Sequence, residues 1–153
     1  MKITELMNKD LIIPTLLAKT KKEALKELVD CVVKKESKVD SAELLRVLLE
    51  REELGSTGIG DGIAIPHGKI KKIENLIVSF GRSLDGVDFQ SMDGKPTHII
   101  FLLIAPENSA GIHLKALARI SRLLKDSAFR RNIMGATTSQ GIYDIIAQED
   151  EKY

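Results

Sequence analysis

The sequence is poor in cysteine, aromatic residues and net charge. Its 153 residues include one cysteine, Cys31, no tryptophan, and an aromatic content of 4%. A single cysteine excludes an intramolecular disulfide and a cysteine metal cluster, and its place in an apolar helical stripe favours core packing over a reactive thiol. The 23 Lys and Arg residues nearly balance the 22 Asp and Glu. Because no basic stripe is interleaved with aromatic residues, nucleic acid is not expected as a partner.

A long hydrophobic run is also missing. The longest unbroken apolar segment, residues 99–105, is far shorter than the roughly 20 residues that a membrane-spanning helix needs. The first ten residues, MKITELMNKD, carry acidic side chains where a signal peptide has an apolar centre. We therefore expect a soluble, cytoplasmic protein with no membrane insertion.

Two long helices are predicted in the first third of the chain. Thr20 is placed as an N-cap before apolar residues that repeat every three or four positions, which predicts a helix over about residues 21–35. Ser41 is a second N-cap candidate, and the helix behind it is expected to end at Gly55. The two helices are typical of a helical hairpin.

The pattern after residue 70 changes from helix to strand and back. The stretches ENLIVSFGRS and THIIFLLIAP are rich in β-branched and apolar residues and are bounded by turn signals, one of them at residues 84–86. The second stretch is apolar on both faces, as a central strand covered by helices would be. Helical spacing then returns in three segments between residues 117 and 146. This order predicts one α/β or α+β domain, residues 1–153, built around a single sheet.

Residues 55–69, GSTGIGDGIAIPHGK, contain five glycines in their first fourteen positions. The phosphate-binding pattern GxxxxGK[ST] is absent, because the GK pair is followed by isoleucine and no glycine stands at the required place upstream. The dinucleotide pattern GxGxxG is absent as well, since the glycines alternate and the segment leads into a strand. Neither nucleotide-binding motif is present.

Two interpretations of this segment remain open from the residues alone. In one, the glycines form a flexible turn and the histidine near its end is structural. In the other, Pro66 ends a strand over residues 63–65 and presents His67 at the rim of the sheet, where Gly68 leaves room for a partner. A neutral imidazole in that place could act as a nucleophile towards a phosphoryl group.

Donors for the charge on such a phosphoryl group are also present. Backbone N–H groups of the glycines could approach it closely, and Arg51, near the end of the second helix, could pair with it as a fork. A solvated helix-end cation is the alternative for Arg51. The glycines expected in the phosphate neighbourhood are Gly58, Gly60 and Gly68.

The other two histidines differ in their settings. His113 is predicted in the first turn of a helix and begins the stripe that continues through Leu117 and Ile120, so it could stay neutral and donate one hydrogen bond to a phosphate. A core histidine bonded to a carbonyl is the alternative. His98 opens a strand and is expected to be structural or exposed. No metal site is expected, because no two of the three histidines have the spacing of a local ligand pair.

The segment GSTGIGDGIAIPHG, with Arg51 sixteen positions before His67, resembles the signature of the type-2 enzyme IIA domain of the bacterial phosphotransferase system, the fructose/mannitol class. The resemblance continues through FLLIAPENSAGIHLKALARISRLL and covers nearly the whole chain. It implies an α/β fold with a mixed sheet flanked by helices on both sides. Within the family, the amino-acid sequence of the motif is most similar to that of the free-standing, nitrogen-related branch.

This resemblance implies specific roles for three residues. His67 would accept a phosphoryl group from a small histidine-containing phosphocarrier protein, with no metal, cofactor or nucleotide. His113 and Arg51 would fall on the family's second histidine and its arginine near the site. The nitrogen-related branch implies a regulatory relay, whose targets include potassium-transport regulators in some bacteria. The alternative is a sugar-specific enzyme IIA that passes the phosphoryl group to a IIB domain.

Overall fold

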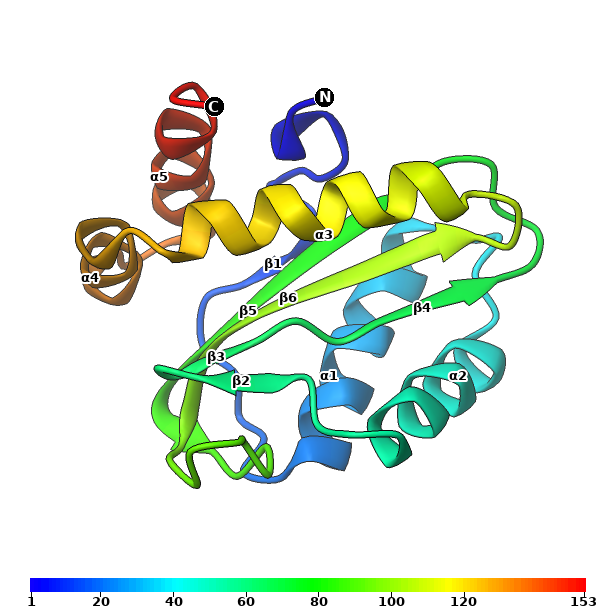
Figure 1. Cartoon of the computed structure of the whole chain (residues 1–153), viewed down its shortest axis with the longest axis horizontal. Coiled ribbons are helices and arrows are strands. Elements are labelled where there is room, and N and C mark those ends of the chain that lie inside the picture. The colour runs from blue at the N-terminus through cyan, green and yellow to red at the C-terminus, as the bar shows by residue number, and fades with distance from the viewer.

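The computed structural model describes residues 1–153, apart from the side chain of Ala110. After two short 3-10 helices and one short strand, the chain forms two α-helices, then the other five strands of the sheet, then three more α-helices (Figure 1). The elements are η1 (Ile3–Glu5), η2 (Lys9–Leu11), β1 (Ile12–Ile13), α1 (Lys21–Lys35), α2 (Ser41–Glu53), β2 (Gly58–Gly60), β3 (Ile63–Ala64), β4 (His67–Ile70), β5 (Ile77–Val87), β6 (Thr97–Pro106), α3 (Ala110–Leu124), α4 (Ser127–Gly135) and α5 (Ser139–Asp150).

The first two helices begin at side-chain caps. Thr20 forms a capping box with Glu23, which confirms the predicted start of α1. The prediction of Ser41 as the second N-cap is wrong by one residue. Asp40 caps α2, since its carboxylate accepts the backbone N–H groups of Ala42 and Glu43, and Ser41 is the first residue of the helix.

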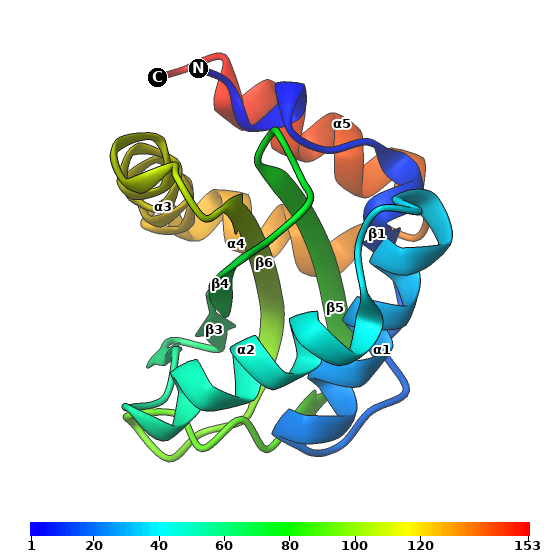
Figure 2. The same cartoon turned by 90° about the vertical axis from the view of Figure 1, so that its right-hand side faces the viewer.

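The sheet is mixed and has six strands. Its order is β1-β5-β6-β3-β2, and β4 also pairs with β6. The pairs β1/β5, β3/β6 and β4/β6 are parallel, whereas β5/β6 and β2/β3 are antiparallel. The central strand β6 is buried from Ile99 to Ala105, as its apolar pattern predicts. Helices α1 and α2 lie on one side of the sheet and α3 and α4 on the other (Figure 2), which confirms the predicted fold class.

The expected turn at residues 84–86 is instead an irregularity within one strand. β5 continues to Val87, and its register against β6 shifts between Arg82 and Val87. Gly86, with φ of 97°, adopts the left-handed backbone that this bulge requires. The turn signal therefore marked a bend in the strand rather than its end.

The glycine-rich segment forms a hairpin followed by an interrupted strand. Asp61 and Gly62, with φ of 57° and 76°, make the two-residue turn between β2 and β3. The expected strand over residues 63–65 ends at Ala64, and the chain resumes as β4 at His67 on the same side of β6. Pro66 interrupts the ladder because it has no N–H, yet its carbonyl accepts the N–H of Leu103 at 3.0 Å and keeps the chain along β6.

Among the helices in the described part of the chain, none has both the length and the low charge that crossing a bilayer requires.

Candidate functional site

His67 is the first residue of β4 and is paired with Leu103 of β6. The side chain is half-buried, and its Nδ1 lies 2.8 Å from the carbonyl oxygen of Ile65. Because a carbonyl can only accept a hydrogen bond, Nδ1 carries the proton and Nε2 keeps the lone pair. The sequence interpretation expected His67 to lie at the rim of the sheet, beyond the end of a strand. The structure instead places it within the sheet ladder, as the first residue of β4.

His113 lies beside His67, although it comes from α3, 46 residues further along the chain. The two ring centroids are 5.4 Å apart with an interplanar angle of 51°. His113 sits in the first turn of α3 and is 9% exposed. Its Nε2 is buried and has no hydrogen-bond partner among the described residues. A buried ring nitrogen without a partner is uncommon in native structures and calls for an explanation.

Both imidazoles are held towards the neutral form. Burial lowers the pKa of His67 below the ordinary value of 6.5, the bond to the Ile65 carbonyl opposes this shift, and the charge of Arg51 adds to it. Burial also lowers the pKa of His113, and a proton on His67 or the charge of Lys69 acts in the same direction. Near pH 7 the pair therefore offers one free lone pair on His67 and no net charge.

Arg51 occupies the last turn of α2 and is half-buried. Its Nη1 donates a hydrogen bond to the carbonyl oxygen of Gly55 at 3.0 Å. Its charge is close enough to depress the pKa of His67, although the two side chains share no hydrogen bond. The structure therefore brings Arg51 to the neighbourhood of the imidazoles. One of its N–H groups is already bonded to the Gly55 carbonyl in the turn that follows α2.

Gly68 faces away from the imidazole pair. Residues 67 and 69 of β4 point to the α3 side, whereas Gly68 points to α2, where an added Cβ would lie 2.6 Å from Cγ1 of Val47. The sequence interpretation gave Gly68 the task of leaving room for a partner at the ring. The geometry gives a different reason for the glycine, which is the close approach of α2 to β4.

Gly58 and Gly60 lie further along the sheet, on β2. Through β3 they are in register with the part of β6 near Ile99 and Ile100, three to four residues from the partner of His67, or about 10–13 Å at the rise of a strand. A Cβ on Gly58 would lie 2.6 Å from Oγ of Ser91, and Gly60 has φ of 99°. Tight packing and backbone conformation explain both glycines without a phosphate, and their predicted role at a phosphate stays a prediction.

Two charged residues of the site escaped the sequence interpretation. Lys69 follows His67 on the same face of β4, and its charge acts on His113. Glu52 is 8% exposed, and its charge raises the pKa of His67. Glu52 could have been found, because it continues the buried stripe of α2 four positions after Leu48 and a charged residue in such a stripe must have a partner.

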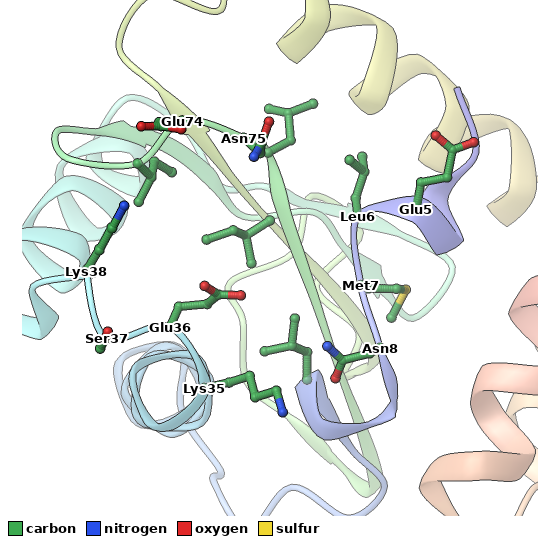
Figure 3. Close-up of a pocket in the computed structure, with 14 residues that line it drawn as sticks. Glu5, Leu6, Met7, Asn8, Lys35, Glu36, Ser37, Lys38, Glu74 and Asn75 are labelled. Carbon is green, nitrogen blue, oxygen red and sulfur yellow. The ribbon is translucent and has the colours of Figure 1, made fainter.

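His98 does not join the site. Its Nδ1 lies 2.8 Å from the carbonyl oxygen of Ser83, at the other end of β6. A cavity of about 400 Å³ is also separate from the imidazole pair. It lies between η1, the C-terminal end of α1 and the loop before β5, with Glu36, Lys38 and Glu74 on its walls (Figure 3). Its lining contains no histidine and no arginine.

The mixed sheet between two layers of helices agrees with the fold of solved structures to which this chain is similar. Residues 5–149 match the family described as "Phosphoenolpyruvate-dependent sugar phosphotransferase system, EIIA 2", and the chain belongs to this family. The resemblance drawn from the sequence is thereby confirmed.

Relatives in this family include both regulatory and sugar-transport proteins. The chain is 43% identical over 147 residues to a nitrogen regulatory protein of Bradyrhizobium diazoefficiens, covering 96% of this chain and 95% of that protein. It is 41% identical over 151 residues to the fructose-specific EIIABC component of Bacillus subtilis, covering 99% of this chain but 24% of that longer protein. The crystal structure of the nitrogen regulatory protein IIA-Ntr from Neisseria meningitidis matches with a TM-score of 0.87 and 31% identity, over 94% of this chain and 98% of that one.

Proposed function

We propose that His67 accepts a phosphoryl group on Nε2 and that the protein acts as a regulatory relay of a nitrogen-related phosphotransferase system. The observation that supports this most directly is the imidazole pair. Nδ1 of His67 is committed to the Ile65 carbonyl, Nε2 keeps its lone pair, and the ring lies 5.4 Å from that of His113, whose Nε2 is buried without a partner. A phosphoryl oxygen would supply the missing partner of His113.

The donor in this proposal is the phosphohistidine of a small histidine-containing phosphocarrier protein. The lone pair on Nε2 of His67 forms a new bond to phosphorus while the donor's phosphorus–nitrogen bond breaks, and the electrons of that bond return to the donor imidazole. The proton on Nδ1 stays in place, held by the Ile65 carbonyl. The step as written needs no metal and no nucleotide.

One hydrogen-bond donor and two cations stabilise the charge that is spread over the phosphoryl oxygens during transfer. His113 donates a hydrogen bond from Nε2, and the charges of Arg51 and Lys69 act through space on the same pair of rings. Phosphorylation replaces a neutral ring by a group of nearly two negative charges at the surface of β4. Binding partners can therefore distinguish the two states by charge.

The regulatory role is favoured over sugar uptake by the similarity to nitrogen regulatory proteins along nearly their full length. The alternative is a sugar-specific enzyme IIA that passes the group to a IIB domain. The 41% identity to the fructose-specific component of Bacillus subtilis keeps this second function in consideration. The downstream partner is accordingly either a regulatory target protein, such as a potassium-transport regulator, or a IIB domain.

The acceptor is tested with phosphoenolpyruvate, enzyme I and the phosphocarrier protein. We expect acid-labile phosphate on the wild-type protein and on His98→Ala, which alters a histidine outside the site, and none on His67→Ala. Phosphate on His67→Ala would refute the assignment of the acceptor.

The two downstream functions are separated by what the phosphorylated protein does next. A relay is expected to keep its phosphoryl group in the presence of fructose- and mannitol-type IIB domains. It should also bind its regulatory target with at least about tenfold different affinity in the two states, which corresponds to 1.4 kcal/mol. Rapid transfer to a IIB domain would establish the sugar-specific alternative instead.

A further inference from the structure

A buried ion pair lies between α1 and the end of α2. Nζ of Lys21 is 3.0 Å from Oε1 of Glu52, and the two side chains are 11% and 5% exposed. Lys21 also donates to Oγ of Ser56 at 3.3 Å and lies 5.2 Å from the centre of the Phe89 ring. An ion pair in such a place gives little net stability, because removing both charges from water costs about as much as their attraction returns. The presence of this ion pair therefore needs an explanation other than stability.

The carboxylate of Glu52 holds one residue by two bonds. Its Oε1 accepts the backbone N–H of Thr57 at 3.0 Å, and its Oε2 accepts the Thr57 hydroxyl. Thr57 is 4% exposed, so neither bond competes with bulk water. Both hydrogen-bond donors of Thr57 are thus directed at a single carboxylate, which fixes the peptide at this point of the glycine-rich segment.

Two further hydrogen bonds continue from Thr57 to the imidazole. The carbonyl oxygen of Thr57 accepts the N–H of Ile65 at 3.1 Å. The carbonyl oxygen of Ile65 accepts the Nδ1–H of His67 at 2.8 Å. A continuous path of hydrogen bonds therefore runs from the carboxylate, through two backbone segments, to the ring nitrogen that decides the tautomer.

We propose that Glu52 is a positioning residue for His67: by holding Thr57, it places the Ile65 carbonyl so that His67 stays in the Nδ1–H tautomer with Nε2 free. Lys21 orients this buried carboxylate through the ion pair at 3.0 Å. The structural part of this proposal is independent of phosphate, and its catalytic consequence rests on the function proposed for His67.

The flanking glycines explain why such a support is needed. The segment between α2 and β4 contains Gly55, Gly58, Gly60 and Gly62, three of which have positive φ. Glycine loses more backbone freedom on ordering than any other residue. The glycine-rich segment therefore needs contacts from outside itself to hold one conformation. The Glu52 carboxylate supplies from α2 the rigidity that the segment's own sequence does not.

The test replaces the ion pair by apolar side chains of similar size, in Lys21→Met/Glu52→Leu, because such replacements usually leave a protein folded. ¹⁵N NMR of the imidazole at pH 8 reads the tautomer directly. In the wild type we expect a protonated Nδ1 and a bare Nε2 on His67. In the double variant we expect the two ¹⁵N shifts to move towards each other as the Nε2–H form appears, and transfer to slow by at least about tenfold.

The matched control is Arg46→Met/Glu50→Leu, which removes an exposed ion pair from the same helix with the same two replacements. It should change neither the tautomer nor the rate. A folded Lys21→Met/Glu52→Leu protein that keeps the Nδ1–H form, or that transfers at the wild-type rate, would overturn the proposal. The NMR result does not depend on phosphate, so it is separate from the outcome for His67→Ala.

A second pair of variants covers the case in which the double variant does not fold. Thr57→Val removes the hydroxyl that Glu52 accepts and keeps the shape of the side chain, whereas Thr57→Ser keeps the hydroxyl. We expect a partial shift of His67 towards the Nε2–H form in Thr57→Val and none in Thr57→Ser. Identical ¹⁵N spectra for the two variants would contradict the proposed path.

Discussion

Two buried ion pairs in this protein have the same chemistry and different consequences. Glu52 and Asp150 each accept the backbone N–H and the hydroxyl of a threonine while pairing with a cation. For Glu52 the threonine is five residues away and is linked by hydrogen bonds to the ring of His67, whereas Asp150 binds Thr4, 146 residues away, and joins the two ends of the chain. The location of a buried carboxylate, rather than its contacts alone, decides whether it serves a site or the fold.

The largest expected effect on stability is at the terminal pair. Asp150→Asn leaves the guanidinium of Arg119, now 2.7 Å from the carboxylate, without its counter-charge in a buried place. We expect the free energy of unfolding to fall by about 3–5 kcal/mol, measured by denaturant titration. Phosphoryl transfer by the folded fraction should stay at the wild-type rate. A slowed transfer would mean that the two ion pairs are not separate in function.

The largest expected effect on transfer, short of removing His67, is at His113. His113→Ala removes the predicted donor to the phosphoryl oxygens, and we expect transfer to slow by about 10²–10³-fold, the range for losing one positioned donor. Rapid-quench measurement of both transfer directions provides the rate. Arg51→Ala is expected to act in the same direction, with Arg46→Ala as the control on the same helix. An unchanged rate in His113→Ala would return that residue to the role of a core histidine.

The acidity of the two imidazoles gives a pH dependence of known sign. Because the pKa of folded His67 is below 6.5, its lone pair is available above that value and is lost as the pH falls through the lower folded pKa. We expect the transfer rate to fall as the pH drops, with a midpoint below pH 6.5. The unfolded chain takes up protons first, so stability from both histidines should also decline as the pH drops below 6.5. A rate midpoint above 6.5 would show that burial does not control the ring.

The smallest effect is expected on the other face of β4. Gly68→Ala places a methyl group 2.6 Å from Cγ1 of Val47, which should destabilise the fold by about 1–3 kcal/mol through overpacking. Val47→Ala in the same chain should recover most of this loss. Gly111→Ala, where an added Cβ meets nothing within 4 Å, is the control and should not be destabilising. Calorimetry compares the melting temperatures of the wild type, Gly68→Ala, Gly68→Ala/Val47→Ala and Gly111→Ala.

Much of the fold followed from local patterns in the sequence. The Thr20 cap, the apolar stripe of α1 and the bounds of β6 were predicted because each depends on neighbours within a few residues. The hairpin turn at Asp61 and Gly62 carried a known signal, an Asp-Gly pair, that the interpretation of the segment as a loop passed over. The return of the chain as β4 could not be predicted, because it depends on the distant carbonyl contact between Pro66 and Leu103.

The two histidines of the candidate site could be identified from the sequence, whereas the contacts that support them could not. His67 and His113 were identified from the sequence, and the fold brings them side by side although they lie 46 positions apart. The ion pair between Lys21 and Glu52 joins two helices, and no periodic pattern specifies which charge on one helix meets which on another. Cys31, expected in the core, lies half-buried and donates from Sγ to the carbonyl oxygen of Asp10, because it lies beside the buried stripe of Leu28 and Val32 rather than within it.

The bond between Thr4 and Asp150 has a consequence for how this domain can be combined with others. Because the first and last turns of the chain are fastened together, residues attached before Met1 or after Tyr153 leave the molecule at one place (Figure 1). A host protein could therefore carry the whole domain within a single surface loop, entering and leaving through neighbouring points, without stretching either connection. The same closeness makes the chain suited to circular permutation, in which a short linker closes the ends and a new opening is cut in an exposed turn.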